Sequence, residues 1–302
     1  MPPSALRVHA ALITVSLLFG GSYVFTKRVL ETVPPTAWVL FRIAAATALM
    51  LPLAALLARQ RHFPPRKTLT TLLLAALLGV AANQVLFVEG MARTTPEHSA
   101  LVNALIPTWT LLAAVIAGQE RLTGLRVLSI AVSLCGVLYL GLDRLLAAGH
   151  DAATTTTMLW GDLLTMGNGI AFAVHLVLMK RLGREVDPWL ATAFLFVTGT
   201  VMVAGWSGPH LTTASVDAVL HPPAVWFAAY VVVGATVVTY LLNTWALRHT
   251  RSSEVALYIN VQPLVAAGLN TALGAPPPGA AFFVALGLVA AGLWLQTRAR
   301  SS

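Results

Sequence analysis

Long apolar stretches alternate with short polar links along the whole chain. A helix that crosses a membrane needs about 20 apolar residues, because each residue advances the helix by about 1.5 Å. Ten stretches meet this requirement, so we predict an all-α integral membrane protein with ten transmembrane helices. The predicted helices cover Ala10–Val29, Pro35–Ala58, Leu69–Ala92, Ser99–Gly118, Leu122–Leu142, Met158–Leu182, Trp189–Trp206, Pro222–Leu247, Val255–Gly274 and Gly279–Gln296.

The links between the predicted helices are mostly short, so consecutive helices are expected to be antiparallel neighbours. The two longest links are Asp143–Thr157 and Ser207–His221. The first link contains a run of Ala and Thr, and it divides the chain into two sets of five helices. We therefore predict two domains, residues 1–150 and residues 151–302, each a five-helix repeat.

The composition excludes a soluble protein. Of the 302 residues, 57% are hydrophobic and 10% are charged, whereas soluble domains carry about 25% charged residues. The net charge of +8 would suggest nucleic-acid binding in a soluble protein. Here the basic residues lie in short links between apolar stretches, so the expected partners are the lipid bilayer and a small-molecule substrate, and no nucleic acid. The single cysteine, Cys135, gives neither a disulfide within the chain nor a metal-binding pattern.

The basic residues also predict the orientation, because cytoplasmic loops are enriched in Lys and Arg. If the N-terminus is cytoplasmic, Lys27, Arg28, Arg93 and Arg144 fall on the opposite side and Arg42 lies within a helix. The other fourteen of the nineteen basic residues then face the cytoplasm. We therefore predict a multi-pass protein of the bacterial inner (plasma) membrane with both termini in the cytoplasm.

The two halves can be aligned at offsets of 153 to 156 residues. Because each half has an odd number of helices, the halves must cross the membrane in opposite senses. Inverted repeats around a site at the midplane are typical of secondary transporters. The matched positions include Lys27-Arg28 with Lys180-Arg181, Leu78-Gly79 with Val233-Gly234, Pro107 with Pro263, and Gly136-Val137 with Gly292-Leu293.

A series of short motifs resembles the drug/metabolite transporter superfamily, and specifically its EamA-type branch of ten-helix transporters. The sequence differs from the family in one respect. The family tends to have an acidic residue after the fourth helix of each half; Glu120 is that residue in the first half, whereas Pro276 takes its place in the second. Any gating or salt-bridge role of the acid is therefore not expected in the second half. The motifs that resemble the family are Leu18–Val24 ending in Lys27, Phe41-Arg42, Met91–Thr95, Ile106-Pro107, Gly118–Thr123, Gly136-Val137, Ala246–Thr250, Gln262-Pro263 and Gly287–Gly292. The resemblance implies two inverted five-helix repeats around a central cavity lined by helices one, three, four, six, eight and nine.

Polar side chains within the apolar stretches are the candidates for lining such a cavity, because in hydrocarbon each of them needs a partner or water. The alternative is that they join helices by hydrogen bonds, which gain about 0.6 kcal/mol on average. As a set they favour a substrate site. The candidate substrate-binding residues are Ser22, Tyr23, Asn83, Gln84, Asn103, His175, Thr239, Tyr240, Asn243, Tyr258, Asn260 and Gln262.

Four further residues have candidate roles, and His175 has a second one. Pro107 and Pro263 remove a backbone donor at matched positions and are candidate hinges, or they only shape packing. His175 is a candidate proton site, or a neutral side chain bonded to a carbonyl. Glu89 is a second candidate proton site, or it pairs with Arg93 four residues on. Arg42 is expected to pair with Glu31 or Glu89, or to meet an anionic substrate.

Together these features predict a secondary transporter that exports small metabolites such as amino acids or related compounds by alternating access. The alternatives are an uptake carrier for a sugar, nucleoside or drug-like compound, and a membrane-embedded lipid-modifying enzyme. The chain lacks P-loop, HExxH, nucleophile-elbow and GxGxxG motifs, so we expect neither an enzyme nor a cofactor or metal. Gly287 and Ala291 share a helix face that is expected to pack within the bundle, and a homodimer is the alternative.

Overall fold

The computed structural model describes residues 5–58, 66–147, 152–182, 186–247, 249 and 258–298, and every element in these ranges is helical. The elements of the first half are α1 (Ala5–Val29), α2 (Pro35–Leu57), α3 (Arg66–Ala76), η1 (Leu77–Ala82), α4 (Asn83–Arg93), α5 (Pro96–Asn103), α6 (Ile106–Ile116) and α7 (Gly124–Ala147). Those of the second half are α8 (Ala152–Leu182), α9 (Pro188–Ser207), η2 (Gly208–His210), α10 (Thr213–Leu220), α11 (Ala224–Ala229), η3 (Tyr230–Val238), α12 (Thr239–Leu247), α14 (Val261–Ala272) and α15 (Ala280–Arg298). The predicted all-α fold is confirmed.

Eight helices of the described chain are long and apolar enough to cross a membrane. A ninth candidate is the bent pair of Thr213–Leu220 and Ala224–Val238, which meet at 78°, and this pair overlaps the predicted span Pro222–Leu247. The remaining predicted span, Val255–Gly274, lies partly outside the described residues, and its described part includes α14.

Both long links contain helical residues that the sequence prediction left outside its helices. α7 continues to Ala147 and α8 begins at Ala152, because Ala, Leu and Thr allow a helix to continue beyond its most apolar part. The link Ser207–His221 contains η2 and α10. The hydroxyl of Thr212 begins α10 by accepting a hydrogen bond from the backbone N–H of Ser215 at 3.1 Å.

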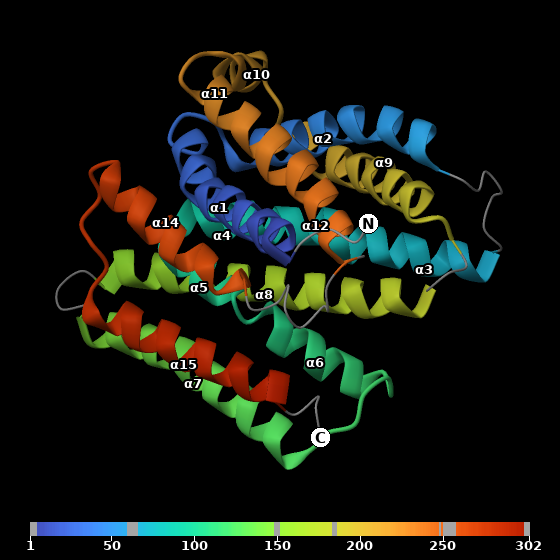
Figure 1. Cartoon of the computed structure of the whole chain (residues 1–302). Helices are drawn as coiled ribbons and strands as arrows, with labels where there is room; N and C mark the ends of the chain where they lie inside the picture. Colours follow the sequence, from blue (N-terminus) through green and yellow to red (C-terminus); the bar gives the residue numbers. More distant parts are fainter. Residues whose placement is uncertain are drawn as a thin grey trace.

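Helices of one half pack against helices of the other in a reciprocal pattern (Figure 1). α2 lies beside α9, and α7 lies beside α15; in each pair the two helices have corresponding places in the two halves. α4 packs on α8 as α12 packs on α1, and α6 packs on α8 as α14 packs on α1. Such reciprocity is what a twofold relation between two similar bundles produces.

The helices are interrupted at matched positions in the two halves. η1 and η3 are π-helical, and the offset of 155 residues places Leu77–Ala82 on Val232–Val237, within η3. The turn between α5 and α6 at residues 104–105 corresponds to the turn at Asn260 before α14. π-helical segments and broken membrane helices occur preferentially at functional sites.

The fourth helix of each half ends at a glycine in the left-handed region. The φ angles are 69° at Gly118 and 96° at Gly274, and these positions match at an offset of 156 residues. A residue with a side chain is strained in this conformation, so glycine is the residue that allows each helix to stop there.

α7 and α15 approach each other through small residues. A Cβ at Gly136 would lie 2.7 Å from the carbonyl oxygen of Ala285, and one at Gly292 would lie 2.7 Å from the carbonyl oxygen of Ser129. Gly287 and Ala291 are exposed instead, and nothing lies within 4 Å of a Cβ at Gly287. The expectation that these two residues pack within the bundle is therefore wrong, because α15 turns its other face to α7.

Candidate functional site

Asn83 and Asn168 hold α4 against α8 within the bundle. The side-chain amide of Asn83 donates to the backbone carbonyl of Asn168 at 3.3 Å, and the amide of Asn168 donates to the carbonyl of Asn83 at 2.9 Å. Gln84 donates to the Oδ1 atom of Asn83 at 3.2 Å. Asn83 and Gln84 are thus close together, while Asn168 was not singled out from the sequence although it lies within an apolar stretch.

His175 lies against the π-helical segment η1. Its Nδ1 donates to the backbone carbonyl of Ala75 at 2.9 Å, and its ring is stacked with Phe172 at 5.6 Å. Gly79 lies so close to the imidazole that any side chain there would collide with it. This is the bonded arrangement that was the alternative to a proton site.

Tyr23 and Asn103 lie near each other on α1 and α5. The Tyr23 ring meets the Phe87 ring edge-on at 5.6 Å, and its hydroxyl neighbours the amide of Asn103 and the guanidinium of Arg42. Both Tyr23 and Asn103 are buried. These side chains come from α1, α4, α5 and α2, so they form one group at the centre of the first half.

Arg42 does not pair with either of the two acids expected from the sequence. Glu31 pairs with Arg28 at 2.9 Å, and Glu89 pairs with Arg93 at 2.5 Å. The guanidinium of Arg42 lies over the Phe87 ring, 5.5 Å from its centroid. The sequence argument failed because each acid has a basic neighbour one helical turn away, which it reaches without crossing the bundle.

The other candidates are distributed over several places. Ser22 donates to the carbonyl of Phe19, and Thr239 to that of Ala235, so each hydroxyl serves its own helix. The Tyr258 hydroxyl bonds Nδ1 of His9 at 2.6 Å, at the opposite end of α1 from Lys27. The side chains of Tyr240 and Asn243 lie outside the described part of the chain.

The candidate hinges mark the matched interruptions. Pro107 is the second residue of α6, and its carbonyl accepts from Gln296 at 3.3 Å. Pro263 is buried in the first turn of α14, which follows Asn260, and the carbonyl of Gln262 lies close to Gly20 of α1. A proline in the first turn of a helix loses no intrahelical hydrogen bond, so both prolines begin helical segments.

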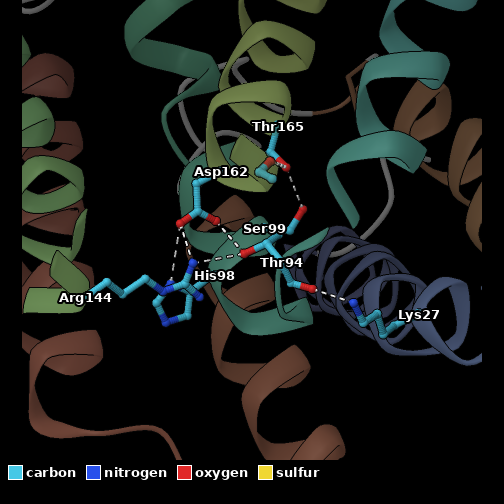
Figure 2. Close-up of polar contacts among 8 residues, drawn as sticks. Lys27, Thr94, His98, Ser99, Arg144, Asp162 and Thr165 are labelled. Carbon is cyan, nitrogen blue, oxygen red and sulfur yellow. Dashed lines mark hydrogen bonds and ion pairs between the residues drawn. The ribbon is translucent and has the colours of Figure 1, made fainter. Parts of the chain in front are cut away.

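A cluster of polar residues ties α1, α7 and α8 to the turn between α4 and α5 (Figure 2). The carboxylate of Asp162 accepts from Thr94 at 2.5 Å and from Arg144 at 2.7 Å, and His98 lies 3.9 Å from it. We call this set the Asp162 cluster; it consists of Lys27, Thr94, His98, Ser99, Arg144, Asp162 and Thr165.

Lys27 and Ser99 extend the cluster. The ammonium of Lys27 donates to the carbonyls of Met91, Ala92 and Thr94 at 2.8 to 3.1 Å, and so completes the end of α4. The hydroxyl of Ser99 on α5 lies 3.3 Å from that of Thr165 on α8. Asp162 lies ten residues after the start of α8.

Several buried polar atoms of α2, α4, α5 and α6 have no hydrogen-bond partner among the described residues. An unsatisfied polar atom in a membrane protein indicates bound water or ligand, because leaving it unpaired is costly. These atoms are Trp38 Nε1, Arg42 Nη1, Gln84 Oε1, Asn103 Oδ1, Thr108 Oγ1 and Trp109 Nε1.

Comparisons with known proteins agree on one family. The model of the EamA-like transporter family matches residues 6–142 and again residues 159–298. The uncharacterized transporter YyaM of Bacillus subtilis is 24% identical over 90% of this chain and 87% of its own length. The uncharacterized inner membrane transporter YedA of Escherichia coli K12 is 24% identical over 97% and 91%. One crystal structure is similar over 98% of this chain and 99% of its own, with 18% identity and a TM-score of 0.58, which shows a common fold.

Proposed function

The chain belongs to the EamA-like transporter family, and from this membership we propose that it is a secondary carrier that exports small metabolites, with amino acids and related compounds as the solutes. Family and relatives establish a membrane transporter. The solute class, the direction and the alternating-access mechanism are the parts that we add.

The observation that carries the proposal is the matched interruption of helices in the two halves. η1 and η3 occupy corresponding positions, as do the turns before α6 and α14. A carrier that opens to either side needs helices that can bend at the same depth in both halves, so that the same motion can occur in either direction. The reciprocal packing of the halves supports two inverted repeats, residues 1–150 and 151–302.

The unpaired polar atoms support a solute site in the middle of the bundle. They come from α2, α4, α5 and α6; α4 packs on α2 and α5, and α4, α5 and α6 all pack on α8. A substrate site at this depth is reached from either side when the halves rock. Asn103 and Gln84 are the expected site residues that supply such atoms.

The orientation we propose places the Asp162 cluster at the periplasmic surface and both termini in the cytoplasm. Glu31 is exposed near the Asp162 cluster, and Thr123 is exposed at the opposite end of the bundle. In a Cys135→Ser background, Glu31→Cys should react with a membrane-impermeant maleimide in intact cells. Thr123→Cys should react only after permeabilisation; the reverse labelling would contradict the orientation.

Transport itself is tested in proteoliposomes. Vesicles with the purified chain are loaded with pools of radiolabelled amino acids, short carboxylic acids, sugars and nucleosides, and efflux is measured with and without a pH gradient. We expect efflux of an amino-acid pool above that of protein-free vesicles. Transport of sugars or nucleosides alone would favour the uptake alternative, and no transport of any pool would contradict the carrier.

A reversible disulfide cross-link between the two halves tests whether transport requires their relative motion. In the Cys135→Ser background, Ser99→Cys and Thr165→Cys place two thiols where the hydroxyls of α5 and α8 now meet. Their oxidation should stop transport and reduction should restore it, because α5 and α8 belong to different halves. Full transport by the cross-linked protein would contradict a motion of the halves at this end.

A further inference from the structure

Arg42 is a buried guanidinium without a carboxylate partner among the described residues. Its exposed fraction is 7%, and its Nη1 atom has neither a hydrogen-bond partner nor contact with solvent. The aromatic face of Phe87, 5.5 Å away, is the neighbour that offsets part of its charge. A cation–π contact contributes about 2 kcal/mol when desolvated, which is less than the several kcal/mol that burial of an ion costs.

The other cations near the same end of the bundle are all satisfied by the protein. Lys27 donates to three carbonyls. Arg28, Arg93 and Arg144 pair with Glu31, Glu89 and Asp162 respectively. The sequence therefore contains enough acids to pair these cations, yet no acid of the described part of the chain pairs with Arg42.

The residues around Arg42 converge at one depth. Tyr23 lies six residues before the end of α1 and Phe87 six before the end of α4, while Arg42 and Asn103 lie seven residues after the starts of α2 and α5. At a rise of about 1.5 Å per residue, all four are about 9–10 Å from the same end of the bundle. Four helices thus bring their side chains to one place.

The polar atoms at this place are mainly hydrogen-bond donors. Trp38 lies one helical turn from Arg42 on α2, is fully buried, and its Nε1–H has no partner among the described residues. The Tyr23 hydroxyl adds a third donor next to the guanidinium. A guanidinium and neighbouring N–H and O–H donors match the geometry of a carboxylate, which arginine binds with two parallel hydrogen bonds.

We infer that Arg42 binds the carboxylate of the transported solute, with Trp38 and Tyr23 as additional donors and Asn103 facing the rest of the molecule. This inference rests on the proposed function and names its solutes as carboxylates. The bound carboxylate supplies the counter-charge that the protein omits. Since the side chain is buried, the solute reaches it when α4 and α5 move away from α1 and α2. The Asp162 cluster holds α1 to the turn between α4 and α5 at one end.

A stability measurement separates this role from a structural one. Arg42→Met keeps the length and the apolar stem of the side chain and removes its charge. If the charge of Arg42 serves to bind a ligand, removing it takes away an unpaired buried ion. Without ligand in detergent, the melting temperature of Arg42→Met should then equal or exceed that of the wild type. Melting several degrees lower, or failure to fold, would show that the bundle needs Arg42 and would overturn the inference.

Binding is tested with amino acids and short carboxylic acids, each compared with its uncharged amide. A ligand that binds the folded state raises the melting temperature. We expect at least one carboxylate to raise the melting temperature of the wild type, and its amide to raise it less. Arg42→Met should abolish this response to the carboxylate, and Arg42→Lys should retain part of it. The matched control Arg93→Met removes a paired arginine on the neighbouring α4 and should respond as the wild type does.

Transport of the same panel distinguishes the inference from the carrier proposal. We expect Arg42→Met to lower carboxylate efflux at least tenfold while Arg93→Met leaves it unchanged. Efflux only of solutes that lack a carboxylate, unaffected by Arg42→Met, would overturn the inference and leave the carrier intact. If a carboxylate raises the melting temperature through Arg42 but no solute is transported, the inference stands and the carrier proposal is contradicted. If there is neither a melting response nor transport, both the inference and the carrier proposal are contradicted.

Discussion

The side-chain amides of Asn83 and Asn168 each donate to the backbone carbonyl of the other residue, at 3.3 and 2.9 Å. The pair joins α4 of the first half to α8 of the second at a buried position. Two reciprocal bonds of this kind fix both the rotation and the axial position of the two helices. They also adjoin the π-helical segment η1, which ends one residue before Asn83.

We expect Asn168→Ala to lower the free energy of unfolding by about 1 kcal/mol, because interhelical hydrogen bonds in membranes contribute about 0.6 and up to about 1.7 kcal/mol. Asn83→Ala should have a similar effect. The double variant should cost less than the sum of the two, since both bonds belong to one pair. Unfolding in detergent measures all three, and additive effects would show that the two amides act independently.

Gly79 and His175 form a second contact between the halves. Gly79→Ala should lower the free energy of unfolding by about 1–3 kcal/mol, because the new methyl group meets the imidazole. Removal of the ring in Gly79→Ala/His175→Ala should recover most of this loss. Gly268→Ala is the control, since no atom of the described residues lies within 4 Å of a Cβ there. An equal loss of unfolding free energy in Gly268→Ala would show that the effect of Gly79→Ala does not come from a collision with His175.

Two glycines of α15 are expected to respond oppositely to the same substitution. Gly292→Ala should destabilise the protein by about 1–3 kcal/mol, because its Cβ would lie 2.7 Å from a backbone oxygen of α7. Gly287→Ala should be neutral or stabilise by up to about 1 kcal/mol, because it faces outward and alanine favours a helix. Thermal unfolding compares the two variants, and equal effects would contradict the close approach of α7 and α15.

The ion pair of Arg144 and Asp162 is expected to contribute more than the exposed pairs of the same surface. The two side chains are 12% and 13% exposed, whereas those of Arg28 and Glu31 are 32% and 52% exposed. Arg144→Gln should therefore cost about 3 kcal/mol, because it leaves a shielded carboxylate without its cation. Arg28→Gln should cost less than about 1 kcal/mol. Similar melting temperatures for the two variants would show that the Asp162 cluster is open to water.

The sequence predicted the features that depend on neighbouring residues. Hydropathy located eight spans of the described chain and the bent pair that is a ninth candidate, because each needs an apolar stretch. The pairing of Glu89 with Arg93 was named as an alternative, since four residues are one helical turn. The π-helical segments were not predicted, because Leu77–Ala82 is apolar throughout, as the residues of a regular membrane helix are.

Features that depend on helix rotation could not be predicted. Asn83 and Asn168 are 85 residues apart, and their contact depends on how far each helix is turned about its axis. The same is true of Asp162 on α8, which pairs with Arg144 on α7. For Arg42, the acids at the right depth were identified, but not that both were already paired.

The segment from proline to left-handed glycine has the same length in both halves. Eleven residues lead from Pro107 to Gly118, and eleven lead from Pro263 to Gly274. In the orientation proposed above, the first segment crosses the inner leaflet and the second the outer leaflet, each over about 16 Å. The protein therefore fits a bilayer with leaflets of equal thickness, and lengthening either segment by a single helical turn would force that half to tilt or to thicken the lipid around it.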